Sequence, residues 1–532
     1  MTSIIPRPRC SSETEGVFSA DPKKLRVYTE KEFSSLNAIL GDALCESESD
    51  ASVKIIYSAE EKQEGYSLEI TEKGVVLEAS SSAGAFYGLQ SLRQLVLLSD
   101  SNGDLVTLKA LRISHDSPLY EWRGLHLDES RHFFGKQTVK KLLSFMALYK
   151  LNRFHWHLTD DQGWRIEIEK YPLLTEKGSK RTGSQLHHWG SKEFDSKEVS
   201  GFYTKEDIRE IVAYARERFI EIVPEIDFPA HIDAALACYK ELACREIDCN
   251  VFVAGKGMKP DADGNKNWNR PICLGKDSSL GFVFDVLDEV SELFPFSCFH
   301  VGGDEAPTAE WKKCPHCQKR IKDEGLRNEV ELQGWFTNKV NEHLRSRGKT
   351  MIGWNEILES DFIDSDIIAQ YWTPKEDKNI IRHLESNGKV ILSCHKHFYF
   401  DMNYSYCTVK NTYSFTPEAA EINGNLKSGV LGCEAELWTE FIESEKELFF
   451  KLWHRGLALS EACWSAPGEK DYALFTESLQ RHKKLADLSG WYYGKDRYTL
   501  DSHSFRNRFE SIFKGYKVKF LDTEYRLDTG EK

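Results

Sequence analysis

Between residues 117 and 466 the sequence alternates repeatedly between short apolar runs and longer amphipathic runs. The apolar runs have the length and composition of buried strands, and they cover residues 123–128, 153–159, 220–226, 297–301, 350–354, 367–372, 389–393 and 429–434. Apolar residues at helical spacing follow many of them, in segments 137–150, 205–218, 282–293, 331–347 and 446–460. Thr204 with Asp207, and Ser444 with Glu447, have capping-box spacing at two helix starts. Eight strand–helix units predict an α/β fold, a closed (β/α)8 TIM barrel.

The rest of the chain forms two smaller parts. Residues 1–116 contain a strand at 53–57, two runs at 66–70 and 75–79 that flank a hairpin signature at 72–74, and an amphipathic helix at 83–98. This pattern predicts a small α/β domain with an antiparallel sheet and helices. We therefore expect three parts: the small domain (1–116), the barrel (117–466), and a C-terminal helix at 472–488 with a tail that packs on the barrel (467–532).

Charge and hydropathy exclude several classes of partner. The chain has 532 residues and a formal net charge of −14, which disfavours nucleic acid or an anionic membrane surface as the main partner. No apolar run reaches the roughly 18–20 residues of a membrane span. Residues 1–10 lack the apolar centre of a secretory signal. The sequence predicts a cytoplasmic protein, or a secreted or periplasmic one if its signal is missing from this sequence. Oligomeric state is not readable.

Thirteen cysteines are scattered through the chain. An odd number in a large protein does not describe a disulfide framework. Cys314 and Cys317 form a C-x-x-C pair that could be half of a zinc site, with Cys244 and Cys249 as possible partners. Neither spacing repeats a known zinc knuckle, so free thiols and no metal are the favoured interpretation.

Chemistry-bearing side chains gather where the predicted strands end. In a barrel of parallel strands the active site lies at the carboxyl ends. The residues at those ends are Asp128, Ser130, Arg131, His132, His155, His157, Asp160, Asp161, Glu225, Asp227, His231, Asp304, Glu305, Trp354, Glu356, Trp372, Tyr399, Asp401, Trp438 and Glu440. Each alone has a structural explanation, such as a buried ion pair or a core tryptophan. The same bias at eight strand ends predicts one shared site.

Asp304 and Glu305 are the most informative of these residues. They follow a buried run and Gly302-Gly303, and desolvating adjacent carboxyls raises the pKa of at least one of them. An acid–base pair is one interpretation. The alternative is a helix N-terminus decorated with acids, which the helix dipole would favour.

Several motifs together resemble glycoside hydrolase family 20, the β-N-acetylhexosaminidases. The resemblance spans roughly residues 3–490 and rests on Arg131, residues 155–164 (HWHLTDDQGW), 225–231 (EIDFPAH), 300–305 (HVGGDE), 353–354 (GW), 437–440 (LWTE) and, in the first domain, 83–90 (AGAFYGLQ). One departure is Ala230, where the family usually has Gly, which adds a methyl beside His231. The last forty or so residues match nothing that we can place.

The resemblance implies an exo-β-N-acetylhexosaminidase that retains configuration and needs no cofactor or metal. In this family the acetamido oxygen of the substrate attacks the anomeric carbon and forms an oxazolinium intermediate, an exception to the usual carboxylate nucleophile. Glu305 would be the general acid and base, and its pKa is expected to be raised by burial and by Asp304. Asp304 would accept the acetamido N–H, and Tyr399 would donate to the acetamido carbonyl.

The resemblance also implies a binding set around these three residues. Trp354, Trp372 and Trp438 would wall the pocket. Arg131, Asp401 and Glu440 would bind ring hydroxyls by charge-assisted hydrogen bonds. Asp160 and His231 would support Glu305, and Asp161 could take the place of Asp160. The expected substrates are terminal β-linked GlcNAc or GalNAc residues of oligosaccharides or glycoconjugates.

Three alternatives keep the barrel and change the chemistry. His155 and His157 lie on one face of a strand and could hold a catalytic metal, although two core histidines have the same spacing. A catalytically silent glycan-binding protein is the second alternative, because fold alone does not give function; the presence of Asp304 and Glu305 disfavours it. Transfer to a sugar acceptor in place of water is the third, and the sequence does not separate it from hydrolysis.

Overall fold

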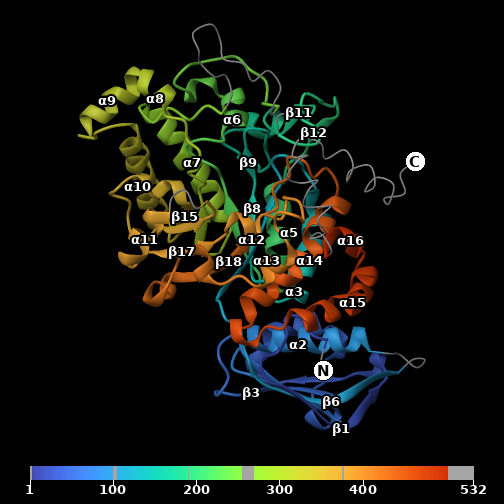
Figure 1. Cartoon of the computed structure of the whole chain (residues 1–532). Coiled ribbons are helices and arrows are strands. Elements are labelled where there is room, and N and C mark those ends of the chain that lie inside the picture. Colours follow the sequence, from blue (N-terminus) through green and yellow to red (C-terminus); the bar gives the residue numbers. More distant parts are fainter. Residues whose placement is uncertain (1–2, 100–104, 190, 254–268, 374–376, 501–532) are drawn as a thin grey trace.

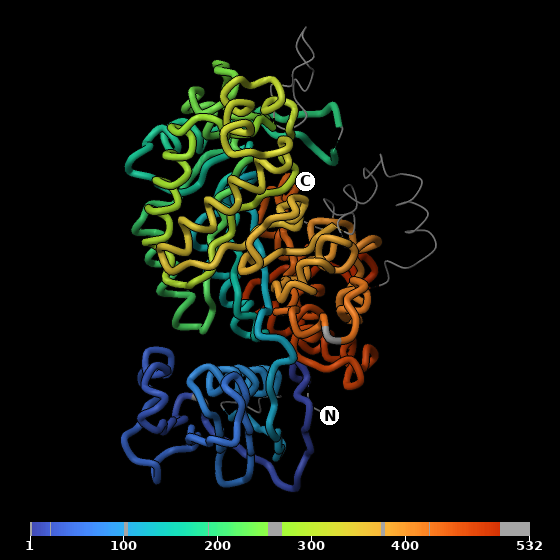
Figure 2. Tube along the Cα trace, turned by 90° about the vertical axis from the view of Figure 1, so that its left-hand side faces the viewer, coloured from blue at the N-terminus to red at the C-terminus, as the bar shows by residue number. Residues whose placement is uncertain are grey.

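The computed structural model describes residues 3–99, 105–189, 191–253, 269–373 and 377–500. A barrel and a smaller sheet domain lie one above the other (Figures 1 and 2). The small domain lies beyond the end of the barrel opposite to the long loops that carry α8 (Ala309–Lys313), α9 (Pro315–Asp323), β11 (Lys180–Thr182) and β12 (Glu198–Ser200). Within the described ranges, no helix combines the length and hydropathy of a membrane span.

Eight parallel strands close into the predicted barrel. In spatial order they are β7 (Trp122–Asp128), β8 (Arg153–His157), β13 (Glu221–Glu225), β14 (Cys298–His300), β15 (Thr350–Trp354), β16 (Ile368–Tyr371), β17 (Lys389–Leu392) and β18 (Val430–Ala435), which pairs with β7. The predicted TIM barrel and all eight strands are confirmed. The observed strands are mostly one or two residues shorter, because the ends of the apolar runs belong to the turns.

Helices surround the barrel at the predicted places. They are α3 (Gly135–Leu148), α5 (Lys205–Arg216), α7 (Asp277–Leu293), α10 (Glu329–Ser346) and α14 (Glu445–Trp464), with α11 (Asp377–Glu385) where no helix was predicted. The capping box at Thr204 and Asp207 is present. At α14 the Ser444 side chain caps the Glu447 N–H, but the Glu447 carboxylate accepts from Glu443 N–H, one residue before the cap. That box is therefore incomplete.

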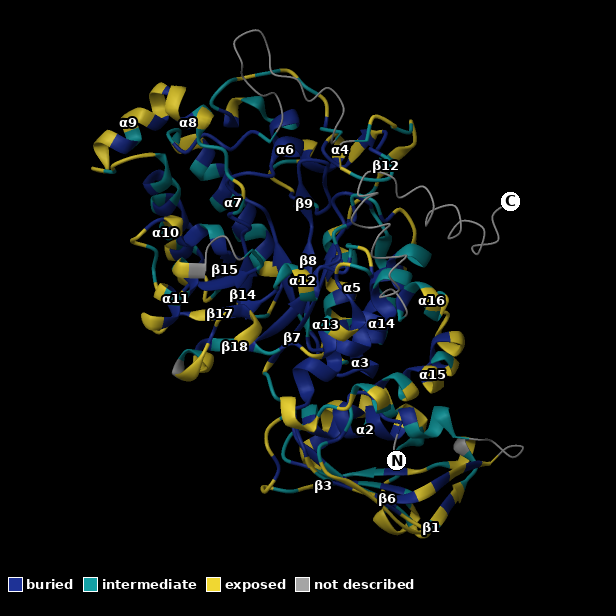
Figure 3. Ribbon diagram, viewed as in Figure 1, coloured by how far each residue is buried: buried dark blue, intermediate teal, exposed yellow. Residues whose placement is uncertain are grey.

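The barrel interior changes character from one end to the other. Alternate strand residues point inward, and the first inward layer is an apolar plug made of Trp122, Val223, Cys298, Ile352, Ile368 and Ile391. The next inward residues are polar: His126, His155, His157, Glu225, His300, Gln370, Glu434 and Glu436, all 0–1% exposed. Figure 3 shows this centre as the most thoroughly buried part of the molecule. The polar layers lead toward the carboxyl ends of the strands, where the predicted site lies.

The first domain is a six-stranded sheet with α2 (Ser82–Leu98) on one face. Its strands are β1 (Ser11–Ala20), β2 (Val27–Thr29), β3 (Val53–Tyr57), β4 (Tyr66–Thr71), β5 (Gly74–Ala79) and β6 (Val106–Asp116), in the order β1-β6-β4-β5-β3-β2. The predicted antiparallel sheet is present, with the predicted hairpin β4–β5 at its centre. Two pairings, β3 with β5 and β2 with β3, are parallel and were not predicted.

The C-terminal helix α15 (Tyr472–Ser489) connects the two domains. His482 lies 3.1 Å from the Tyr149 hydroxyl beside the barrel and 2.6 Å from the Ser3 carbonyl oxygen of the first domain. Trp491 stacks on Phe449 of α14, with ring centroids 6.4 Å apart. A short helix, α16 (Asp496–Thr499), follows. The rest of the predicted tail lies outside the described residues.

Candidate active site

A cavity of about 570 Å³ opens at the carboxyl ends of the barrel strands. The structure places all eleven predicted site residues along its wall: Arg131, Asp160, His231, Asp304, Glu305, Trp354, Trp372, Tyr399, Asp401, Trp438 and Glu440. These residues come from the ends of all eight strands, and more than 300 positions separate the first from the last. The closed barrel brings them together, because parallel strands end at one rim.

The two glycines before Asp304 allow a tight turn at the end of β14. Gly302 and Gly303 have φ of +67° and +95°, in the left-handed region that favours glycine. A Cβ on Gly302 would lie 1.6 Å from a carboxylate oxygen of Asp227, so any side chain there would collide. Glu305 also adopts a positive φ, +47°, despite its side chain. Helix α8 begins only at Ala309, so the alternative of an acid-decorated helix N-terminus is wrong.

Asp304 and Glu305 have different protonation behaviour. Burial raises the pKa of Asp304 to about 6, helped by the charge of Glu305 and opposed by His231. The pKa of Glu305 is lowered, because the His231 imidazole lies 3.5 Å from its carboxylate and outweighs partial burial. The predicted raised pKa of Glu305 is therefore wrong for this geometry. Its side chain is 57% exposed, so desolvation is too weak to compete with the neighbouring cation.

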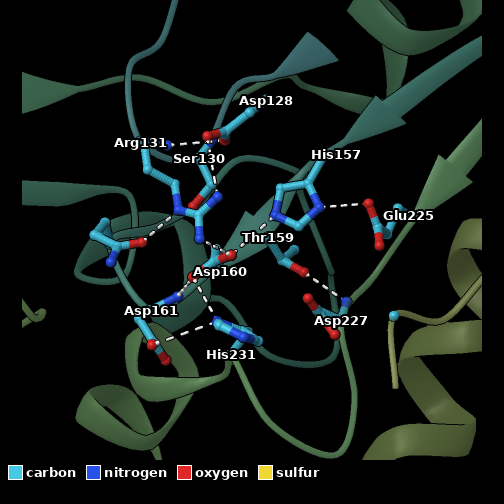
Figure 4. Close-up of polar contacts among 12 residues, drawn as sticks. Asp128, Ser130, Arg131, His157, Thr159, Asp160, Asp161, Glu225, Asp227 and His231 are labelled. Carbon is cyan, nitrogen blue, oxygen red and sulfur yellow. Dashed lines mark hydrogen bonds and ion pairs between the residues drawn. The ribbon is translucent and has the colours of Figure 1, made fainter. Parts of the chain in front are cut away.

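A row of ion pairs connects His231 to Arg131 through Asp160 (Figure 4), and Glu305 lies next to its His231 end. His231 Nδ1 lies 3.3 Å from Asp160 Oδ1, and Asp160 Oδ2 lies 2.7 Å from Arg131 Nη2. Asp161 is 3.7 Å from the same imidazole nitrogen, so Asp160 is the nearer partner and Asp161 a second one. Burial would raise the pKa of Asp160, but the charges of Arg131 and His231 hold it well below its usual range. Asp160 is thus a fixed anion that keeps His231 charged beside the catalytic pair.

Aromatic rings form two walls of the pocket. The indoles of Trp354 and Trp438 lie 5.8 Å apart between centroids. On the other side, Trp372 and Tyr399 lie 5.8 Å apart with an angle of 24° between their planes. Such flat apolar faces, with a hydroxyl and indole N–H groups at their edges, suit one face of a sugar ring or a small amide.

A polar corner completes the pocket. The Arg131 guanidinium lies 5.1 Å from the centroid of Trp438, and its Nη1 is 3.7 Å from Glu440 Oε1. Burial, with the charge of Glu440, raises the pKa of Asp401 to about 7. Asp401 Oδ1 and Asp304 Oδ1 are buried oxygens without a hydrogen-bond partner in the described part of the chain. Buried acceptors of this kind are costly unless a ligand donates to them.

Two carboxylates outside the predicted set hold the tryptophans in place. Trp354 Nε1 donates to Glu225 at 2.9 Å, and Trp372 Nε1 donates to Glu356 at 2.9 Å. Burial and the charge of Asp304 raise the pKa of Glu356 to about 8. Both acids stand at strand ends, which is a readable signal, but nothing in the sequence shows which indole each one contacts.

Two further residues contribute to the pocket without having been assigned a role. Asp227 lines it beside Gly302, and burial together with the charge of Asp304 raises the pKa of Asp227 well above its usual value. Trp189 lies on the loop between β11 and β12, lines the same pocket and is 53% exposed. Its ring centroid is 5.6 Å from that of Phe441. No sequence signal locates a long loop over a pocket.

His155 and His157 turn inward as predicted, but they lie beneath the pocket and do not line it. His155 contacts Glu434 at 2.7 Å and Glu225 at 3.1 Å, and His157 contacts Glu225 at 2.5 Å and Asp160 at 3.1 Å. Both imidazoles are at most 1% exposed. Their geometry is that of buried ion pairs that support the pocket floor. The metal-dependent alternative is disfavoured.

Comparison with known families explains this arrangement. The family model "Glycosyl hydrolase family 20, catalytic domain" matches residues 120–467, and "Glycosyl hydrolase family 20, domain 2" matches residues 1–114. The chain belongs to glycosyl hydrolase family 20. The sequence resemblance is thereby confirmed for both the barrel and the first domain.

Individual family 20 members give the same result. A β-hexosaminidase of Porphyromonas gingivalis is 36% identical over 524 residues, which cover 92% of this chain and 64% of that protein. The β-hexosaminidase of Vibrio furnissii is 33% identical and covers 74% of this chain and 64% of its own length. This chain thus spans a little under two thirds of these curated relatives.

Solved family 20 structures superpose over nearly the whole chain. An exo-β-N-acetylglucosaminidase from Vibrio harveyi, in complex with N-acetylglucosamine, has a TM-score of 0.80 at 28% identity and covers 93% of this chain and 78% of its own. A β-N-acetylhexosaminidase from Bacteroides fragilis has a TM-score of 0.79 at 28% identity, with 94% and 98% covered. The similarity therefore includes the small domain as well as the barrel.

Proposed function

We propose that this protein is a retaining exo-β-N-acetylhexosaminidase. It removes terminal, non-reducing β-linked GlcNAc or GalNAc from oligosaccharides or glycoconjugates, with the substrate acetamido group as nucleophile. The observation that carries the proposal is the pair Asp304 and Glu305 in an aromatic pocket. Asp304 Oδ1 is buried there, and none of the described residues donates a hydrogen bond to it. An acetamido N–H can donate to it, and the named family members act on the same class of sugar.

In the first step the acetamido carbonyl oxygen attacks the anomeric carbon. The glycosidic carbon–oxygen bond breaks, and Glu305 gives its proton to the departing oxygen. The product is an oxazolinium ion, whose positive charge lies on the former acetamido group. Asp304 accepts the N–H hydrogen bond and stabilises that charge, and the Tyr399 hydroxyl donates to the acetamido oxygen and positions it. Holding nucleophile and carbon in one pocket replaces a bimolecular encounter with an intramolecular step.

In the second step Glu305 accepts a proton from water. The water oxygen bonds to the anomeric carbon, the oxazolinium ring opens, and the acetamido group is restored. Two inversions at one carbon leave the configuration retained. Transfer to a sugar hydroxyl would follow the same route, with the acceptor in place of water.

The lowered pKa of Glu305 is compatible with its role as the acid. A sugar in the pocket covers the side chain that is now 57% exposed, and desolvation then raises the pKa of the carboxyl. His231 opposes this rise and is held by Asp160. The balance between desolvation by the sugar and the charge of His231 sets the pH at which Glu305 is protonated. The Asp160–His231 pair therefore acts on the reaction through Glu305, as positioning residues.

The remaining predicted roles follow the same geometry. Trp354, Trp372 and Trp438 contact the apolar face of the sugar and the acetamido methyl, and Arg131, Asp401 and Glu440 bind its hydroxyls. No cofactor takes part in these steps. The location of the protein, cytoplasmic or alternatively secreted or periplasmic, stays a prediction.

Comparing two aryl substrates tests the proposal. The enzyme is given an aryl N-acetyl-β-glucosaminide and the plain aryl β-glucoside in buffer with a chelator. We expect cleavage of the first and none of the second, because the glucoside lacks the nucleophile. Equal cleavage of both would point to an enzyme carboxylate as nucleophile. Cleavage of neither, in a folded protein, would favour the glycan-binding alternative.

A further inference from the structure

Four cysteines that are far apart in the sequence meet beside the active-site loops. The sulfur atoms of Cys244, Cys273, Cys314 and Cys317 all lie within 4.8 Å of one another. Three of the pairs, Cys244–Cys317, Cys273–Cys314 and Cys273–Cys317, are 3.7 Å apart. We propose that this four-cysteine cluster is a structural metal site that binds one zinc ion through four thiolates.

The sulfur spacing fits a tetrahedral ion. Zinc–thiolate bonds of about 2.3 Å in a tetrahedron place the sulfurs about 3.8 Å apart along each edge. A disulfide would need a sulfur–sulfur distance of about 2.05 Å. The observed 3.7 Å separations therefore match the edges of a tetrathiolate site. Among metals, four sulfurs in a tetrahedron select zinc or iron over the harder cations.

Two cysteines of the cluster stand at the start of a helix. Cys314 is the residue before α9 and Cys317 lies in its first turn, with Pro315 at the first helical position. The free N–H groups and the positive end of the helix dipole favour thiolate over thiol at this point. Cys314 is 4% exposed and Cys317 is fully buried. A redox pair needs an accessible nucleophilic thiol, so this C-x-x-C pair is not placed for thiol exchange.

The other two cysteines lie on neighbouring backbone segments. Ala243 and Ile272 form an antiparallel bridge, and the Cys273 N–H donates to the Leu242 carbonyl at 2.8 Å. The Gly275 N–H donates to the Cys273 sulfur, a contact that stabilises sulfur carrying negative charge. A Cβ on Gly275 would lie 2.1 Å from the carbonyl carbon of His316. Glycine is therefore required for the two cysteine pairs to approach each other.

The cluster has the features of a closed, structural site. Three of its four cysteines are buried and the fourth is partly buried. Binding of Zn²⁺ would displace four protons and leave a net charge of −2 on the ion and its ligands. The Lys276 ammonium lies 2.9 Å from the Ala243 carbonyl oxygen, next to Cys244 in the chain, and supplies positive charge nearby. No fifth position is needed for a substrate.

The four-cysteine cluster lies where a metal would join two loops of the active site. The Ile272 N–H donates at 2.8 Å to the carbonyl of Pro229, two residues before His231. Cys314 follows Glu305 by nine residues on the loop after β14. A metal here connects the loop that carries His231 to the loop that carries Asp304 and Glu305. It would keep His231 and Glu305 at their ion-pair distance without touching the substrate.

Metal analysis of the intact protein tests the site. The enzyme is purified without chelators or immobilised metals, and its zinc and iron are measured by mass spectrometry. We expect about one zinc per chain in the wild type and in Cys249→Ser, and nearly none in Cys273→Ser. Cys249 is the matched control, because its sulfur lies 3.2 Å from Arg270 and outside the cluster. Iron measured in place of zinc would support the metal site and would mean that the bound ion is iron.

Thiol titration gives a second readout that does not depend on a variant folding. In denaturant with a chelator all thirteen thiols should react, and modification of the protein by a thiol reagent in the presence of a metal indicator should release about one zinc per chain. Growth in cobalt should give a sulfur-to-cobalt charge-transfer band and the visible bands of a tetrahedral ion. A metal-free protein with thirteen free thiols would overturn the proposal, and so would a metal-free protein with fewer, which would indicate disulfides. Neither result bears on glycosidase activity, which the aryl substrates test separately.

Discussion

The core of the first domain and the barrel layers beneath the active site are equally buried but opposite in chemistry. In the first domain the inward faces of β3, β4 and β5 are apolar: Ile55, Leu68, Ile70, Val75 and Leu77 are 0–1% exposed. In the barrel, His155 is buried to the same extent, and its ring nitrogens lie 3.1 Å from Glu225 and 2.7 Å from Glu434, which are also buried. One interior is stabilised by contact with neighbours of any apolar kind. The other depends on each charge keeping its specific partner.

This difference shows that the barrel interior beneath the active site gives up stability in return for function. An apolar core loses stability in proportion to the volume removed. A buried charge that loses its partner incurs the full desolvation cost at once. We therefore expect changes in the core of the small domain to alter stability alone, whereas changes in the barrel interior should alter stability and catalysis together.

The largest effect on activity is expected at the catalytic pair. Glu305→Gln should lower kcat/KM by about 10²–10⁴-fold on a substrate with a poor leaving group, because proton donation is lost. The loss should shrink as the leaving group improves. Asp304→Asn should cost several kcal/mol of transition-state stabilisation, about 10²-fold or more, with every leaving group. Steady-state kinetics on a graded series of aryl glycosides measures both. Turnover close to wild type in either folded variant would contradict the assignment.

Breaking the polar interior should affect stability and rate together. Glu225→Gln removes the charge that faces His155, His157 and His300 and weakens the acceptor for Trp354. We expect the free energy of unfolding to fall by about 3–5 kcal/mol, the cost of breaking a buried ion pair. Urea unfolding followed by fluorescence measures it, and kcat should fall in the same variant. An unchanged unfolding midpoint would show that the histidines are neutral and that the interior is not held by charge.

The matched change in the apolar interior should separate the two properties. Leu77→Ala in β5 opens a cavity under α2, where Leu77 packs closely against Gly88. We expect a loss of about 2–5 kcal/mol in the free energy of unfolding. Values of kcat and KM in the folded variant should match those of the wild type, since the small domain contributes no pocket residue within the described ranges. If kcat fell although the variant was fully folded under the assay conditions, the first domain would have to position the active site.

The smallest effect concerns pH and has opposite signs for stability and activity. Asp304 has a pKa of about 6 in the folded protein and an ordinary value of 3.8, so the folded state binds its proton more tightly than the unfolded state does. Stability should therefore fall as pH rises from about 4 to 6. Activity should rise through the same upper range, because the ionised carboxylate stabilises the oxazolinium charge.

Asp304→Asn tests both signs. Above pH 6 the variant should be more stable than the wild type, by about 1–3 kcal/mol, because the cost of a buried charge is gone. Its residual activity should lack the acidic limb near pH 6. Thermal unfolding and kcat/KM across pH 4.5–8 measure the two quantities. A variant less stable than the wild type at pH 8 would show that the ionised Asp304 is stabilising.

The fold could be predicted from the sequence because inward-facing residues recur with a different period in strands and in helices. Runs such as 350–354 alternate with helices such as 331–347, and the register of residues along each strand decides which side chain points inward. The helix α11 and the two parallel pairings in the first domain were missed. Helix α11 is short and mostly polar, and strand order in a sheet depends on contacts between segments that are distant in the sequence.

The site residues were readable for a different reason. A barrel places every strand end at one rim, so residues such as Arg131 and Glu440 can be assigned to one pocket once the strands are counted. Glu225 and Glu356 were seen at strand ends but not assigned, since their partners are the indoles of Trp354 and Trp372 on other strands.

The sequence by itself determined the barrel, the family and the members of the pocket, because these follow from local periodicity and from motifs that are contiguous in the chain. Only the tertiary structure decided the quantities that depend on distances between segments. The lowered pKa of Glu305 arises from His231, on the loop after another strand. The meeting of Cys273 with Cys314 and Cys317 has the same origin: of the two possible partners named from the sequence, Cys244 belongs to the cluster and Cys249 does not, and Cys273 was not named. Coulombic and coordination energies depend on separation in space, which the order of residues does not contain.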